Sequence, residues 1–345
     1  MPRHNFQPLR GRLEEIEIAS PAAGDNLLGD PAKRRVLVYL PEDYDADSSR
    51  QYPLLVALAA YTGSGLKLMN WQSFDETLAQ RVDRLIEAGD MPPCVLAMPD
   101  CFTSLGGNQY INSPVLGMWE DFMYQDLLPG LASEFRVLDD APHRAVFGHS
   151  SGGYGALIHA MRHGEQWGAV ACHSGDMGFD LLYRPEFPKA VRALAKYDGD
   201  AQAFLSALAD APKIRGDEFY AMMMLAMAAT YDPQPDAPLQ MRLPVDPHTC
   251  ELDEDAWARW LAHDPVELAR DDTVLDRLRG LRALHIDCGS RDEYNLHFAS
   301  RRLHAALNAA QIDHAYEEFP DGHSKVAYRL DVSLPRLARA IAPMS

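Results

Sequence analysis

The sequence predicts an α/β protein with a mostly parallel, doubly wound sheet. Short apolar runs with strand character alternate with segments of helical period through two parts of the chain, and this alternation is typical of parallel sheets. A long segment of different composition, residues 178–273, separates the two parts. The length of 345 residues allows one large domain with an insertion or two domains, and a hydrophobic content of 47% is ordinary for a protein with a sizeable core.

The first part of the chain contributes six predicted strands and three predicted helices. Residues 13–19 alternate charged and apolar side chains, which is typical of an edge strand. Residues 53–59 are continuously apolar, as expected of a strand that is buried on both faces. Similar apolar runs predict strands at 35–40, 94–98, 145–147 and 169–173, and helical periodicity predicts helices at about 74–88, 119–135 and 153–162.

The second part contributes strands at 284–288 and 315–319, a helix at about 296–310 and a C-terminal helix. Because strands and helices alternate on both sides of the interruption, we expect one α/β core formed by residues 1–177 and 274–345. Residues 178–273 then form a helical insertion within it.

The predicted insertion has a composition of its own. It carries Met222, Met223, Met224 and Met227, then a proline-rich stretch, and then two tryptophans. An insertion after the carboxyl end of a strand is expected to lie over the binding edge of the sheet, as a cap. Methionines there can form the insertion's own core, line a substrate pocket, or do both.

The most informative segment is the run Gly148-His149-Ser150-Ser151-Gly152, which follows an apolar strand and precedes a helix of small residues. A serine on such a sharp strand-to-helix turn is exposed at the top of the sheet, next to helix N–H groups that can bind an oxyanion. Ser150 has a glycine two residues away on both sides, whereas His149 breaks this pattern for Ser151. The sequence therefore predicts Ser150 as a nucleophile.

A serine nucleophile needs a base and a carboxylate that orients the base. On this type of fold the acid and then the histidine follow the serine along the chain. Among thirteen histidines, His323 alone combines this order with a loop position and a neighbouring glycine. Asp292 lies in the loop after the preceding strand and is the expected acid, with Glu293 as the alternative.

An oxyanion hole needs two backbone N–H groups near the nucleophile. One is expected from Ser151, the residue after the nucleophile. The other is expected from Tyr61 in the glycine-rich loop that follows the strand at 53–59.

Charge and cysteine usage narrow the possible partners. A formal net charge of −18 disfavours nucleic acid and anionic membrane surfaces. The five cysteines form no Cys-x-x-Cys pair, and together with an N-terminus that lacks an apolar signal core they favour a reduced, cytoplasmic protein. The chain contains no His-Glu-x-x-His, no phosphate loop and no dinucleotide motif, so we expect no metal and no cofactor. The expected partner is a small-molecule ester, and the sequence leaves open whether the chain forms a homo-oligomer.

Together these motifs resemble the esterase D-like branch of the α/β-hydrolases. This branch includes feruloyl and acetyl-xylan esterases, S-formylglutathione hydrolases, enterochelin-esterase-like proteins and bacterial mycolyltransferases. The resemblance is carried by five segments: 61–65, 119–122, 148–157, 288–292 and 321–324.

The resemblance implies an α/β-hydrolase fold and a triad of Ser150, Asp292 and His323. We therefore expect a serine carboxylesterase that acts on short-chain or aryl esters through an acyl-enzyme. An acyltransferase, a thioesterase and a non-catalytic binding protein are the alternatives. One departure stands out: Ala59-Ala60 occupies the place where the family usually has His-Gly before the oxyanion residue.

Overall fold

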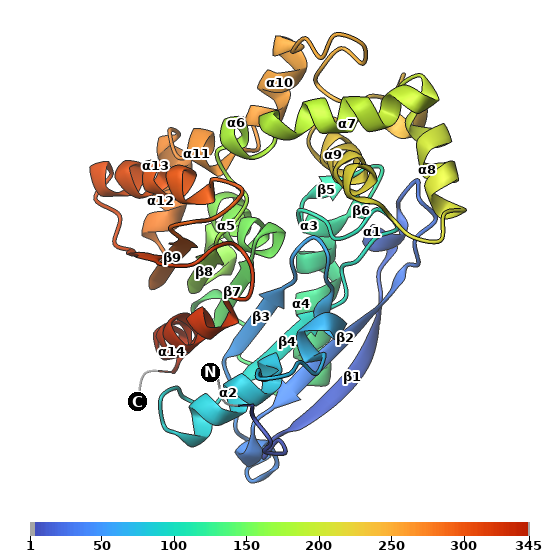
Figure 1. The fold of residues 1–345 in the computed structure, drawn as a ribbon. Coiled ribbons are helices and arrows are strands. Elements are labelled where there is room, and N and C mark those ends of the chain that lie inside the picture. The colour runs from blue at the N-terminus through green and yellow to red at the C-terminus, as the bar shows by residue number, and fades with distance from the viewer. Residues whose placement is uncertain (1–3, 344–345) are drawn as a thin grey trace.

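The computed structural model describes residues 4–343 and contains a central sheet of eight strands (Figure 1). The strand order is β1-β2-β4-β3-β7-β8-β9-β10, in which β1 and β2 run antiparallel to their neighbours and the strands from β4 to β10 run parallel. The strands are β1 (Arg12–Ala19), β2 (Lys33–Leu40), β3 (Leu54–Leu58), β4 (Val95–Pro99), β7 (Arg144–His149), β8 (Ala169–His173), β9 (Ala283–Gly289) and β10 (Ala315–Phe319).

Every strand of this sheet was predicted, with bounds that agree within two residues. A separate hairpin of β5 (Asn112–Ser113) and β6 (Gly117–Met118) was not, because two-residue strands carry no periodic signal. The mostly parallel sheet with helices on both faces confirms the predicted α/β class.

Fourteen helices of α type accompany the sheet among the described residues. They are α1 (Pro21–Gly24), α2 (Leu78–Glu87), α3 (Trp119–Asp121), α4 (Leu128–Glu134), α5 (Ser151–His163), α6 (Phe179–Leu182), α7 (Phe187–Leu194), α8 (Ala201–Ala209), α9 (Gly216–Tyr231), α10 (Glu254–Leu261), α11 (Pro265–Leu268), α12 (Asp272–Arg279), α13 (Leu296–Ala309) and α14 (Leu330–Ile341). The predicted helix at 119–135 is one continuous run in which a π-helical turn, Phe122–Leu127, joins α3 to α4.

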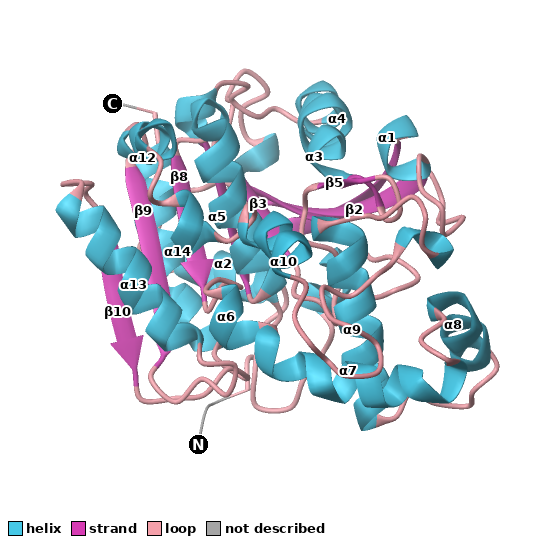
Figure 2. Ribbon diagram, turned by 90° about the horizontal axis from the view of Figure 1, so that it is seen from above, coloured by secondary structure: helices cyan, strands magenta, loops and turns pink. Residues whose placement is uncertain are grey.

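The helices cover the two faces of the sheet in different ways. Apolar side chains of α2 and α14 form one core with the strands that they cover. On the opposite face α5 packs on β3, β7 and β8, and α13 packs on β9 (Figure 2). This second core is the larger, and it includes the buried methionines and tryptophans of the segment between β8 and β9.

The connection from β8 to β9 contains helices α6 to α12. Figure 1 shows α7, α9 and α10 beyond one end of the sheet, whereas α12 packs against α5 beside it. The predicted insertion boundary at residue 273 falls within α12.

Two observations concern membrane spans and disulfide bonds. No helix within residues 4–343 has both the length and the apolar character that crossing a lipid bilayer requires. The five cysteines are unpaired, and four of them, Cys94, Cys101, Cys172 and Cys288, are buried.

Candidate active site

Ser150 occupies a strained turn between β7 and α5. Its φ of 57° and ψ of −125° are values that a residue other than glycine rarely adopts. The N–H of Ser150 donates to the carbonyl of His173 at 3.0 Å, which fixes the turn against β8. A Cβ on Gly148 would lie 2.4 Å from the Gly152 carbonyl, and one on Gly152 would lie 2.1 Å from the Leu58 oxygen. Both glycines are therefore required by close backbone packing.

Ser150, His323 and Asp292 form a continuous hydrogen-bonded line. Ser150 Oγ lies 3.0 Å from His323 Nε2, and His323 Nδ1 lies 2.7 Å from Asp292 Oδ2. The Asp292 side chain is fully buried. Burial alone would raise the pKa of Asp292, but hydrogen bonds from His323 and from the N–H groups of Tyr294 and Leu296 hold it below its usual value. The carboxylate is thus ionised and in place to orient the imidazole.

The two candidate acids occupy different positions around the histidine. Glu293 Oε2 accepts the backbone N–H of His323 at 2.8 Å and makes no hydrogen bond to its ring. Between the alternatives that the sequence left open, Asp292 alone touches the imidazole. Glu293 instead holds the loop that carries it.

His149 supports His323 from the other side. Its Nε2 lies 2.9 Å from the carbonyl oxygen of His323, so this nitrogen carries a proton and donates. Burial lowers the pKa of His149 to about 3, with further lowering from His323 and His173. His149 is therefore a neutral hydrogen-bond donor at ordinary pH.

The two predicted oxyanion donors, Tyr61 and Ser151, line the same pocket as Ser150. Within residues 4–343, no group accepts a hydrogen bond from the backbone N–H of either residue. Neither N–H group is therefore engaged by another described residue. The Tyr61 side chain is buried, and its hydroxyl donates to the carbonyl of Leu105.

Asp176 is a site residue that the sequence analysis missed. It follows the carboxyl end of β8, it is 7% exposed, and its Oδ1 lies 3.4 Å from Ser150 Oγ. Its Oδ2 accepts from Gln109 Nε2 at 3.0 Å and from Ser151 Oγ and the Tyr183 hydroxyl, each at 3.2 Å. The available signal was its position: neighbouring strands β7, β8, β9 and β10 place Ser150, Asp176, Asp292 and His323 at one edge of the sheet.

Ser150, Asp176 and His323 line a pocket of about 530 Å³. Its walls include the loop after β3 and, from the segment between β8 and β9, Tyr183, Phe219, Met223 and Met227. Met222 and Met224 are buried in the core instead. The methionine run thus serves both roles considered for it, because its members face in different directions.

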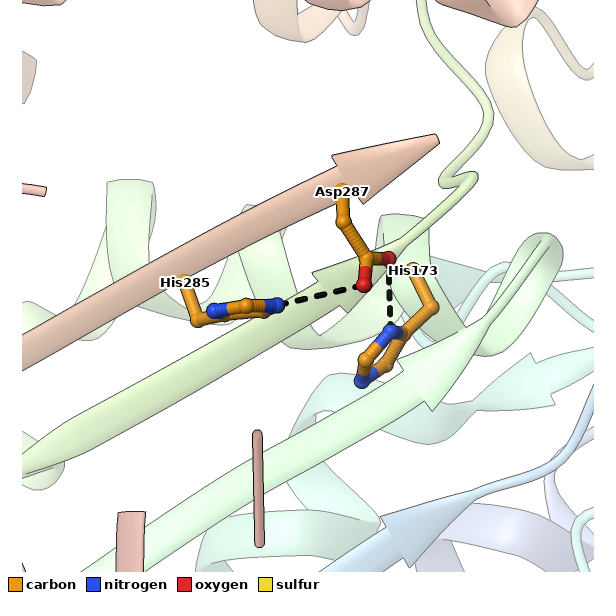
Figure 3. A group of neighbouring side chains, drawn as sticks. All are labelled: His173, His285 and Asp287. Atoms are coloured by element: carbon orange, nitrogen blue, oxygen red, sulfur yellow. Dashed lines mark hydrogen bonds and ion pairs between the residues drawn. The ribbon is translucent and has the colours of Figure 1, made fainter. Parts of the chain in front are cut away.

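A second cluster, His173, His285 and Asp287, has donors close enough to suggest a metal site (Figure 3). Asp287 accepts from His173 Nδ1 at 2.7 Å and from His285 Nε2 at 3.2 Å, and Arg329 Nε lies 3.0 Å from the same carboxylate. Burial would raise the pKa of Asp287, but the two imidazoles outweigh it and hold this pKa below the usual value. The imidazole nitrogens and a guanidinium already satisfy the carboxylate, so the cluster fits a buried ion-pair network and not a metal site.

Comparisons with known proteins relate this chain to esterases. A family model described as putative esterase matches residues 31–335. An esterase of Mycobacterium tuberculosis strain H37Rv is 33% identical over 146 residues, which cover 41% of this chain and 28% of that protein. The matched region thus spans less than a third of this relative's length.

Solved structures extend the likeness to nearly the whole chain. A ferulic acid esterase has a TM-score of 0.62 at 19% identity and covers 96% of this chain and 100% of its own. An S-formylglutathione hydrolase from Agrobacterium tumefaciens has a TM-score of 0.60 at 14% identity, and the match covers 99% of this chain and 100% of that chain. At such identities the likeness concerns the fold, and it confirms the predicted α/β-hydrolase fold.

Proposed function

We propose that this protein, which belongs to the putative esterase family, is a serine carboxylesterase that forms an acyl-enzyme on Ser150. The observation that carries the proposal is the line from Ser150 Oγ through His323 to the buried Asp292, set beside a pocket. A serine hydroxyl that is hydrogen-bonded to an oriented imidazole is the arrangement that acyl transfer requires. The family membership confirms the resemblance inferred from the sequence.

In the proposed mechanism, His323 Nε2 takes the proton of Ser150 as Oγ attacks the ester carbonyl. The tetrahedral oxyanion is held by the N–H groups of Tyr61 and Ser151, which have no other acceptor among residues 4–343. The imidazolium of His323, stabilised by Asp292, then protonates the leaving alkoxide. Water enters, gives its proton to His323, and releases the acid from Ser150 by the reverse sequence.

We propose that residues 178–273 act as a cap that shapes the substrate pocket. Four pocket-lining side chains support this: Tyr183, Phe219, Met223 and Met227 all come from this segment. A pocket of about 530 Å³ is within the size range of small-molecule sites. Its aromatic and thioether walls favour short-chain or aryl acyl groups.

The test is hydrolysis of p-nitrophenyl esters from acetate to octanoate by wild type, Ser150→Ala and Ser151→Ala. We expect Ser150→Ala to lose about 10³-fold or more in kcat. Ser151→Ala keeps its backbone N–H and the Ser150 hydroxyl, so it should retain far more activity. In parallel, a fluorophosphonate probe should add its mass to wild type and to Ser151→Ala, but not to Ser150→Ala. Wild-type turnover by Ser150→Ala would disprove the proposal.

A further inference from the structure

The two oxygens of the Asp176 carboxylate accept different numbers of hydrogen bonds. Oδ2 accepts three hydrogen bonds, from Gln109, Ser151 and Tyr183. Oδ1 has a single neighbour, Ser150 Oγ, at 3.4 Å. A serine hydroxyl carries only one hydrogen, and in the catalytic arrangement that hydrogen points to His323 Nε2 at 3.0 Å. Oδ1 is then left without a donor inside the pocket.

A second buried acceptor lies beside it. Gln109 is 1% exposed, and its Oε1 has no hydrogen-bond partner among the described residues. The amide orientation is fixed by its surroundings, because Nε2 donates to Asp176 Oδ2 and to Ser151 Oγ, both at 3.0 Å. Turning the amide would place Oε1 against the Asp176 carboxylate. Gln109 and Asp176 both line the pocket that contains Ser150.

Two buried acceptors without donors are unfavourable in a resting protein, since buried polar groups are normally paired. Gln109 Oε1 is closed off from solvent, whereas Asp176 Oδ1 lies next to Ser150 Oγ at the pocket and can accept a hydrogen bond from a ligand. The matching ligand group is a hydrogen-bond donor, either a hydroxyl or an ammonium, and the carboxylate would also attract a positive charge. Burial raises the pKa of Asp176, while Gln109, His323, Ser151 and Tyr183 act in the opposite direction.

We propose that Asp176, held in place by Gln109, forms a specificity subsite for a hydroxyl or ammonium group carried next to the scissile carbonyl, on the acyl side of the ester. This rests on the proposed esterase function. In an acyl-enzyme the carbonyl carbon is bonded to Ser150 Oγ, so a donor on the adjacent carbon can reach Asp176 Oδ1. The leaving oxygen must face His323 Nε2 to be protonated, which leaves the Asp176 side to the acyl group. The preferred substrates are therefore hydroxyacyl or aminoacyl esters.

Three esters of nearly equal size test the subsite: p-nitrophenyl propionate, glycolate and glycinate, which carry a methyl, a hydroxyl and an ammonium at the same position. We expect wild type to prefer the last two by about tenfold or more in kcat/KM, after correction for uncatalysed hydrolysis. The ratio of kcat/KM between two esters is taken within each variant, so an effect of the substitution on the triad that is common to all esters cancels. Matched esters with the donor on the alcohol side, such as 2-hydroxyethyl against propyl propionate, complete the set.

The informative variant is Asp176→Asn. Its amide oxygen has to accept from Gln109, Ser151 and Tyr183, so its NH₂ group takes the place of Oδ1 and faces the substrate. The glycinate preference should fall by about tenfold or more, because an ammonium cannot accept from an amide, and the glycolate preference should fall less. Tyr231→Phe is the matched control. It removes a hydroxyl that lies 3.2 Å from the Tyr183 hydroxyl but does not line the pocket, and it leaves every donor to Asp176 in place, so both ratios should change by less than about threefold.

The subsite and the esterase function can fail separately. Binding of the ethyl esters of glycine, glycolate and propionate to Ser150→Ala, measured by saturation-transfer NMR, reports on the pocket without turnover. If wild type hydrolyses all three p-nitrophenyl esters equally, or Asp176→Asn leaves both ratios unchanged, the subsite is refuted while the esterase stands. If wild type hydrolyses none and Ser150→Ala still binds the donor-bearing esters preferentially, the subsite stands and the esterase function fails. A preference confined to alcohol-side donors would overturn the acyl-side assignment.

Discussion

Replacing Asp292 by asparagine is expected to lower kcat/KM for ester hydrolysis by about 10³- to 10⁴-fold. The reason lies in two of the hydrogen bonds that the carboxylate accepts. Oδ2 accepts from His323 Nδ1 at 2.7 Å, and Oδ1 accepts from the backbone N–H of Tyr294 at 2.9 Å. An asparagine has one oxygen for these two donors.

Each orientation of the new amide is unfavourable for catalysis. If its oxygen stays with Tyr294, its nitrogen donates to His323 Nδ1, and the imidazole carries its proton on Nε2, where it cannot accept from Ser150. If its oxygen turns to His323, the N–H of Tyr294 is left without an acceptor, at a cost of about 1–3 kcal/mol. In both cases the charge that stabilises the imidazolium is gone. A loss of 10³- to 10⁴-fold corresponds to about 4 to 5.5 kcal/mol at the transition state.

The assay is steady-state hydrolysis of p-nitrophenyl acetate, with circular dichroism to verify folding of each variant. Glu293→Gln is the matched control, because the glutamine oxygen can still accept the His323 backbone N–H that Glu293 binds at 2.8 Å. Its kcat/KM should fall by less than about tenfold. If Glu293→Gln falls as far as Asp292→Asn, or Asp292→Asn stays within tenfold of wild type, the orienting role assigned to Asp292 is wrong.

Two further predictions concern stability and are measured by urea unfolding. Gly152→Ala should destabilise the fold by about 3 kcal/mol or more, because the new Cβ would lie 2.1 Å from the Leu58 oxygen. Gly216→Ala is the control: its new Cβ meets nothing within 4 Å, so it should not lower the free energy of unfolding. If both variants lose equal stability, close packing at Gly152 is not the cause. Asp287→Ala should cost about 3–5 kcal/mol at neutral pH, because it leaves Arg329 and two histidines without their buried partner. Because the pKa of Asp287 is lowered in the folded state, its contribution to the free energy of unfolding is complete above about pH 4 and is lost as the pH falls. The difference in unfolding free energy between wild type and Asp287→Ala should therefore become smaller in acid.

The parts of the fold that could be predicted are those whose signal is local. A continuously apolar run such as β3 indicates a buried parallel strand without knowledge of its neighbours. The helix predicted at 74–88 begins instead at Leu78, because Phe74 has a positive φ and Thr77 caps the helix together with Gln80. The Thr-x-x-Gln pattern was present in the sequence, so turn chemistry and not tertiary structure explains this difference.

Residue types and spacing alone do not define an active site. Ser333 Oγ lies 2.9 Å from His173 Nε2, and His173 Nδ1 lies 2.7 Å from Asp287, so a second Ser-His-Asp line exists with distances like those of the first. Ser333, however, is fully buried within α14, whereas Ser150 lies on a strained turn at a pocket. Access and backbone strain separate the two serines, and only the strand-to-helix turn around Ser150 was visible in the sequence.

Asp176 could not be predicted for a related reason. Its significance depends on partners from three separate segments: Gln109 from the loop after β4, Ser151 from α5 and Tyr183 after α6. No periodicity links these positions. The sequence could indicate only that a carboxylate follows a strand next to the one carrying Ser150.

Ala59-Ala60 stands where the family that the sequence resembles usually has His-Gly, and other contacts hold this loop. A useful oxyanion donor must be held in place before the reaction begins. The Ala59 carbonyl accepts from the Tyr110 hydroxyl at 2.6 Å, and the Tyr61 carbonyl accepts from the N–H of Gly107 at 2.5 Å. The Tyr61 hydroxyl, in turn, donates to Leu105. Residues 105–110 thus anchor this loop on both sides of Tyr61, so the oxyanion donor that we propose is held in place without a histidine at position 59.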